Sequence, residues 1–178
     1  ILPFLLFSGY AGWAADAFSK RSVLIATKSM EIAAMALALW AFWLGNAILG
    51  LFVLFLMSLQ STLFSPAKYG ILPEMLPEKH LSSANGWLEM STFLAIILGS
   101  ALSGTLYKWW GSDLPVIGAI LLALAILGTA ASFGIDRVPP SGAKVKMRIN
   151  PWTEIGLGIR RLYGIKPLWR TVIGISYF

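Results

Sequence analysis

Residues 12–21 read GWAADAFSKR, and they form a short charged interruption between two long apolar runs. Asp16 follows Gly12 at a spacing of four residues, and the bases Lys20 and Arg21 follow Asp16 within five. Charged side chains are costly in apolar surroundings, so their positions in an apolar chain are informative. The rest of the chain can be oriented from this stretch.

The amino-acid composition is typical of a membrane protein. Of the 178 residues, 57% are hydrophobic and 12% are charged, whereas soluble domains carry about 25% charged residues. Several apolar runs approach the roughly 20 residues that cross a bilayer as a helix. We therefore expect an all-α polytopic membrane protein. With no cysteine and a single histidine, His80, the chain offers no disulfide or thiol ligand, and we expect no metal and no cofactor.

The apolar runs predict five membrane spans, which cover residues 1–18, 22–44, 47–65 and 82–110, and then a stretch that ends near residue 135. Gly45 and Asn46 predict a tight turn between the second and third spans. The fifth span is expected to begin with Asp113 or Ser112 as its cap and Pro115 in its first turn, where a missing N–H costs nothing. The proline-rich segment 66–80 is expected to be a loop.

Basic residues set the orientation of these spans. If the loops alternate between the two sides, 12 of the 14 basic residues fall on one side, Lys108 falls on the other and Lys28 lies within a span. Such an asymmetry indicates the cytoplasmic side. The stretch 12–21 and the segment after Asp136 are therefore predicted to be cytoplasmic. Because the first span then enters from outside, we expect an odd number of spans before it and interpret the chain as part of a longer protein.

The segment 136–167 is predicted to be a basic cytoplasmic linker between the spans of residues 1–135 and a further span that begins at 168–178. Its first part contains Pro139-Pro140 and a cluster of Lys and Arg. Asn150-Pro151 then resembles a helix start. The apolar residues after it recur at helical spacing and predict an amphipathic, interfacial helix; they are Trp152, Ile155, Ile159, Leu162 and Tyr163.

The spacing of Gly12, Asp16, Lys20 and Arg21 resembles the signature loop of the major facilitator superfamily, between its second and third helices. The family pattern is roughly G-x-x-x-D-R-x-G-R-K/R, and this chain departs from it at Ala17 and Ser19. The resemblance implies a partial major facilitator fold that covers helices two to six and the start of seven. It also implies that Gly12 is a packing site and that the three charged residues form a conformational latch. The alternative is a basic loop that only sets topology.

A second stretch, SPAKYGILPE at 65–74 followed by LSSANGWLE at 81–89, resembles the loop between helices four and five in the lysophospholipid transporter branch of that superfamily. The residues that carry this resemblance are Pro66, Lys68, Tyr69, Pro73 and Asn85. The resemblance implies alternating access, import of lysophospholipid across a bacterial-type inner membrane, and re-acylation by a fused or separate acyltransferase. The C-terminal half of the same transporter is the implied structural partner, and nothing in the chain suggests nucleic-acid binding or an enzyme site.

Three charged residues lie within the predicted spans and away from the span ends, and they are functional candidates by default. Lys28 and Glu31 are three residues apart on one helix face; either they neutralise each other or one of them lines the central cavity. Glu89 has no basic residue three or four positions away, so it is a candidate for carrying a proton or meeting a cationic headgroup. Two other functions therefore stay open: a proton-coupled exporter of small amphiphilic molecules, and the membrane portion of a fused phospholipid acyltransferase.

Overall fold

The computed structural model describes residues 2–137, 139, 156, 160 and 163–176. All of its regular elements within these residues are α-helices, which confirms the all-α expectation. The helices are α1 Leu2–Ala17, α2 Lys20–Leu44, α3 Ala47–Gly70, α4 Leu72–Met75, α5 Glu78–Trp110, α6 Leu114–Ser132 and α8 Lys166–Ser176.

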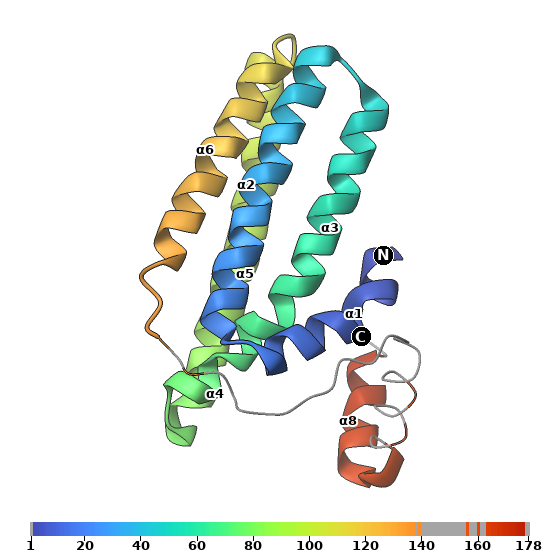
Figure 1. The fold of residues 1–178 in the computed structure, drawn as a ribbon, viewed down its shortest axis with the longest axis vertical. Helices are drawn as coiled ribbons and strands as arrows, with labels where there is room; N and C mark the ends of the chain where they lie inside the picture. Colours follow the sequence, from blue (N-terminus) through green and yellow to red (C-terminus); the bar gives the residue numbers. More distant parts are fainter. Residues whose placement is uncertain (1, 138, 140–155, 157–159, 161–162, 177–178) are drawn as a thin grey trace.

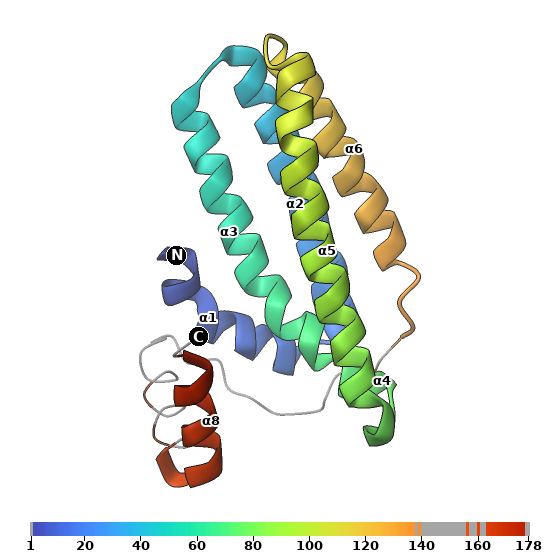
Figure 2. The same cartoon turned by 180° about the vertical axis from the view of Figure 1, so that it is seen from behind.

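Four long helices, α2, α3, α5 and α6, form an elongated bundle (Figure 1). Helix α2 packs mainly against α3 and α6 and occupies the centre of the described fold. Helix α5 lies behind α2 in Figure 1 and in front of it in the reverse view (Figure 2). None of its residues is buried. Four helical segments are long and apolar enough to cross a membrane: α2, Ala47–Met75, α5 and α6. The chain is therefore a polytopic membrane protein.

The first predicted span is helical but differs from the other four. Among the described residues, helix α1 covers Leu2–Ala17. It packs mainly on α3 and lies obliquely across the end of the bundle where α4 is found (Figure 1). Ala15 of α1 joins Val23, Leu24, Ala67 and Ile71 in a buried cluster at that end.

The turn between α2 and α3 is as predicted. Gly45 adopts the left-handed conformation at φ 61°, which an L side chain rarely takes, and its N–H donates to the carbonyls of Ala41 and Phe42. The Asn46 side chain accepts a hydrogen bond from the N–H of Leu49 at 3.1 Å and caps α3. Two adjacent residues therefore end one span and start the next.

The prediction of a loop over residues 66–80 is wrong. Helix α3 continues through Pro66 to Gly70, α4 follows at once, and α5 begins at Glu78. Proline removes a single backbone hydrogen bond, a loss that helices in membranes tolerate. Ala67, directly after the proline, is fully buried in the cluster with α1 and α2. Packing of the helix end thus outweighs the local effect of the proline.

The predicted cap of α6 also differs in detail. Asp113 is the N-cap residue, but its side chain forms no capping hydrogen bond; its backbone carbonyl accepts from the N–H of Val116 at 3.0 Å instead. The helix ends at Ser132 rather than near 135. Most of the predicted linker, including the amphipathic helix after Asn150, lies outside the described residues. Helix α8 begins at Lys166, two residues before the predicted span, and is stabilised by stacking of the Tyr163 and Trp169 rings at 4.0 Å.

Candidate functional site

Lys20, in the first turn of α2, forms a partly buried ion pair with Glu74 of α4. The exposed fraction of the side chain is 9% for Lys20 and 22% for Glu74. Gly70, at the end of α3, leaves room for this lysine, since a Cβ built there would come within 2.8 Å of Lys20 Cε. The contact therefore joins the stretch 12–21 to the segment that follows α3.

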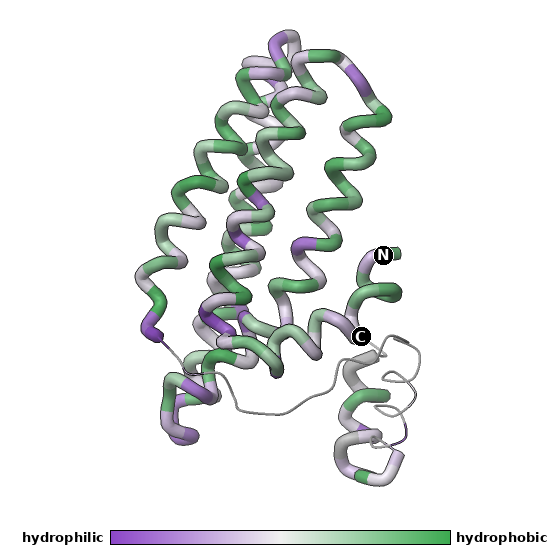
Figure 3. The backbone as a smooth tube through the Cα atoms, in the orientation of Figure 1, coloured by the Kyte–Doolittle hydropathy of each residue, from purple (hydrophilic) through white to green (hydrophobic). Residues whose placement is uncertain are grey.

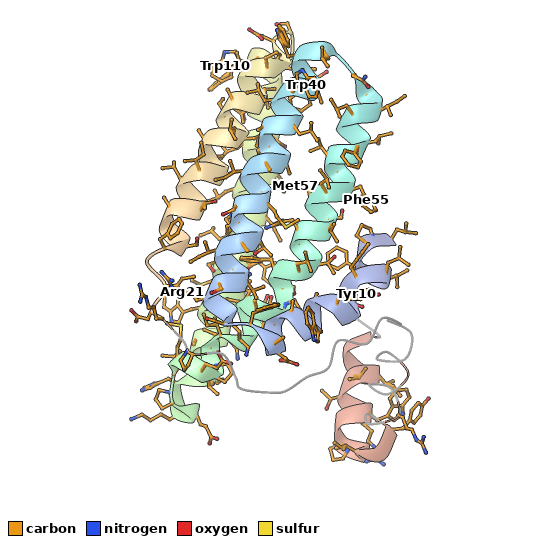
Figure 4. All side chains as sticks on the ribbon, viewed as in Figure 1. Tyr10, Arg21, Trp40, Phe55, Met57 and Trp110 are labelled. Carbon is orange, nitrogen blue, oxygen red and sulfur yellow. The ribbon has the colours of Figure 1, made fainter. Side chains whose placement is uncertain are left out.

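Arg21 reaches a different element, the end of α6. Its Nε donates to the carbonyl of Ile135 at 2.6 Å and its Nη2 donates to the carbonyl of Phe133 at 3.1 Å. Both carbonyls lie just after α6, which ends at Ser132, and a cation at that end also meets the negative end of the helix dipole. In Figure 4 the Arg21 side chain lies at the end of α2 next to the end of α6.

The other two residues of the predicted latch, Gly12 and Asp16, are not packed tightly against another described helix. Asp16 is exposed in the last turn of α1. A Cβ built on Gly12 meets no atom within 4 Å, so no described helix packs tightly against this glycine. The structure thus brings Lys20 to α4 and Arg21 to α6, and keeps Asp16 at the surface of the described chain.

A cavity of about 820 Å³ lies between α2, α3 and α5. Lys28 and Glu31 both line it and are paired, with Lys28 Nζ 2.5 Å from Glu31 Oε2. Gln60 of α3, which is 5% exposed, donates to the same Glu31 oxygen at 3.3 Å. Hydrophilic segments accordingly interrupt the apolar courses of α2 and α3 (Figure 3). Lys28 and Glu31 are thus paired with each other, and both side chains line this cavity.

Lys68 gives this cavity a surplus positive charge. Its Nζ donates to Thr92 Oγ1 of α5 at 2.8 Å, and no described carboxylate lies within 4.0 Å of it. Since Lys28 is balanced by Glu31, the charged lining of the cavity carries one net positive charge. Lys68 also lines a smaller cavity of about 310 Å³ together with Lys28 and Phe64. An ammonium with a hydroxyl partner and open space is suited to bind an anionic group.

The Glu89 carboxylate has a hydrogen-bond donor on another helix. Tyr69 donates its hydroxyl to Glu89 Oε1 at 2.6 Å, and Lys68 Nζ lies 5.4 Å from the centre of the Tyr69 ring. The lining of the large cavity does not include Glu89. The remaining residues of the second stretch have structural positions: Pro66 is inside α3, Pro73 is in the first turn of α4, and Asn85 is exposed on α5.

The sequence matches the Major Facilitator Superfamily model over residues 1–178. The chain belongs to the major facilitator superfamily. No solved structure matches it significantly. Within this superfamily member, the described residues contain no group of His, Cys, Asp and Glu that could hold a metal ion.

Several similar proteins are bacterial and are named lysophospholipid transporter LplT. The chain is 28% identical to the one from Serratia proteamaculans (strain 568) over 186 residues, which cover 100% of this chain and 43% of the relative. It is 31% identical to the one from Enterobacter sp. (strain 638), with 98% of this chain and 42% of the relative covered. For Salmonella paratyphi B (strain ATCC BAA-1250 / SPB7) the identity is 36%, with coverages of 72% and 30%. The chain thus spans less than half the length of these relatives.

Three partners in this major facilitator site were missed at the sequence level. They are Glu74 for Lys20, Thr92 for Lys68 and Tyr69 for Glu89. Each pair joins two different helices, whereas spacing along one helix reveals only neighbours three or four residues apart. Glu74, Tyr69 and Lys68 all lie in the stretch 65–74, and that clustering was the one available signal.

Proposed function

We propose that the whole protein moves lysophospholipid across a bacterial-type inner membrane by alternating access. The observation that carries the proposal is the polar cavity between α2, α3 and α5, with the surplus ammonium of Lys68 in its wall. A lysophospholipid presents a phosphate and a single acyl chain, so a cationic cavity inside an apolar bundle fits its headgroup. The names of the relatives, two of which match at least 98% of this chain, support the same substrate class.

In this proposal Lys68 binds the phosphate, and Thr92 is the hydroxyl that the phosphate displaces or shares. The Lys28–Glu31 pair, fixed by Gln60, forms the polar floor of the site. In folds of this kind the halves rock about a site near the midplane, so the C-terminal half would complete the cavity. The contacts of Lys20 and Arg21 would hold one closed state of the transporter. A fused or separate acyltransferase would consume the imported lipid, and the transporter itself would perform no chemistry.

The experiment is transport of labelled lysophospholipid by the whole protein in liposomes. Lys68→Met is expected to reduce transport strongly, and Lys68→Arg, which keeps the charge, is expected to retain part of it. Lys79→Met is the matched control, because Lys79 is exposed at the start of α5 and does not line the cavity. Failure of the unmodified protein to move lysophospholipid between leaflets would disprove the proposed function.

The Tyr69–Glu89 hydrogen bond favours a second candidate, a proton-coupled exporter of small amphiphilic molecules. The Glu89 carboxylate accepts a hydrogen bond from Tyr69, which follows Lys68 directly in the sequence. A carboxylate with a proton donor and a nearby cation is suited to proton coupling. Glu89→Gln should then abolish transport driven by a pH gradient while exchange without a gradient continues. Equal gradient-driven transport by Glu89→Gln and the unmodified protein would rule this candidate out.

A further inference from the structure

A second cavity, of about 500 Å³, lies between α2 and α3 next to the polar one. It is bordered by Ala38 and Ala41 of α2, by Gly50, Leu54 and Met57 of α3, and by Leu121 of α6. None of its described lining residues carries a charged, hydroxyl or amide side chain. Ala38 and Ala41 on the α2 side are only 6% and 2% exposed, whereas Leu54 on the α3 side is 63% exposed, so the cavity opens from the packed α2 toward the outer surface of α3.

The two cavities meet at Met57, which lines both. Figure 4 shows Met57 between α2 and α3, whereas Phe55, two residues earlier, lies on the far side of α3. The flexible thioether chain of methionine fills irregular space and adapts readily to different neighbours. Met57 therefore separates the polar cavity from the apolar one by a side chain that can move.

A single face of α3 borders both cavities along most of the helix. Gly50, Leu54 and Met57 line the apolar cavity, and Met57, Ser61, Phe64 and Lys68 line the polar one. Their spacings of three and four residues place them on one side of a helix. This face is apolar over its first half and carries hydroxyl and ammonium groups in its second half. Its apolar part, from residue 47 to 57, is about 15 Å long at 1.5 Å per residue.

We propose that the apolar cavity holds the acyl chain of the lipid whose phosphate binds Lys68. This subsite rests on the proposed function and adds where the chain lies and which residues select its length. An amphiphile laid along α3 would place its charged end at Lys68 and its tail between Ala38 and Leu54. Each methylene transferred into such an apolar site strengthens binding by about fourfold, so the depth of the cavity determines chain-length preference.

Gly50 is the position at which this subsite can be filled. A Cβ built on Gly50 meets no atom within 4 Å, so the side chain of Gly50→Leu extends into the cavity instead of into a neighbouring helix. Gly104→Leu is the matched control, because a Cβ on Gly104 also meets nothing within 4 Å and Gly104 lines neither cavity. Leucine also favours a helix more than glycine does, so neither substitution weakens helix formation locally.

The test measures transport by the whole protein in liposomes with long-chain and short-chain lysophosphatidylethanolamine. Gly50→Leu removes room for about two methylenes, so at about fourfold each kcat/KM for the long-chain lipid should fall roughly fifteenfold, while the short-chain value stays within about twofold. Gly104→Leu should leave both values unchanged. Equal losses for both lipids, or no loss for the long-chain lipid, would overturn the acyl subsite. In either case transport by the unmodified protein still supports the proposed function, whereas its complete failure would remove both.

A second measurement needs no substitution. A long-chain lysophospholipid with a photoreactive group at the end of its acyl chain is bound to the unmodified protein, irradiated and located by peptide mass spectrometry. Labelling within residues 35–42 or 47–57 is expected. Labelling confined to other helices would overturn the proposed subsite even if Gly50→Leu failed to fold.

Discussion

Glu74→Gln is expected to lower the free energy of unfolding of the whole protein by about 3 kcal/mol. The substitution removes the charge that compensates the Lys20 ammonium, whose side chain retains only 9% exposure. Breaking a buried ion pair by removing one partner costs about 3–5 kcal/mol. The lower end applies here because the Glu74 side chain retains 22% exposure, so water still reaches the pair. The loss arises from a buried charge without a partner, and not from the shape of the glutamine.

A double-mutant cycle separates this cause from simple loss of contact. Replacing the pair together, as Lys20→Met with Glu74→Leu, should restore most of the stability, because a buried ion pair can often be exchanged for apolar residues at little cost. Unfolding in detergent can be followed by the fluorescence of the eight tryptophans. Glu78→Gln serves as the control, since Glu78 is exposed and forms no ion pair with any described residue. The reasoning would be refuted if the stability losses of the two single variants simply added in the double variant, or if Glu74→Gln left the free energy of unfolding unchanged.

Three further predictions use the same unfolding assay. Lys28→Met should lower the free energy of unfolding by about 2–3 kcal/mol, because it leaves the Glu31 carboxylate without its cation. The double variant with Glu31→Leu should recover stability but not transport. Recovery of both would contradict a role in the cavity. Thr129→Val should cost about 0.5–1 kcal/mol, because it removes the hydrogen bond from Oγ1 to the carbonyl of Lys28 at 3.0 Å; a neutral effect would show that this bond contributes nothing. Arg21→Met should cost about 1–2 kcal/mol through its two bonds to the end of α6, with Arg21→Lys in between, and equal losses for both would argue against paired donors.

The spans could be predicted because they depend on composition averaged over many residues. Long apolar runs and the Gly45-Asn46 turn carry local signals. The segment 66–80 shows the limit of such signals. Pro66 and Pro73 indicate a break, whereas the burial of Ala67 and Ile71 against α1 and α2 keeps the chain helical. That burial depends on how three helices pack, which no single stretch of sequence reveals.

The site could be predicted only where its members share a helix. Lys28 and Glu31 follow from a spacing of three on α2, and the structure pairs them. The resemblance of 65–74 to a transporter loop directed attention to Lys68 and Tyr69, but their partners Thr92 and Glu89 lie on α5. Which residue of α5 faces which residue of α3 depends on the register between the helices. Register is a property of tertiary packing and has no local sequence pattern.

Helix α2 connects the ion pair of Lys20 with the cavity that Lys28 and Glu31 line. Its first turn holds Lys20 on α4 and Arg21 on α6, while Lys28 and Glu31 lie within its next turns, about 12 Å along the axis at 1.5 Å per residue from Lys20 to Lys28. A helix is stiff over that length, so a shift at the cavity must move the first turn as well. Binding that displaces Lys28 would then strain both contacts of the stretch 12–21 together. The charged stretch 12–21 would thereby be coupled mechanically to the cavity, as the proposed alternating access requires.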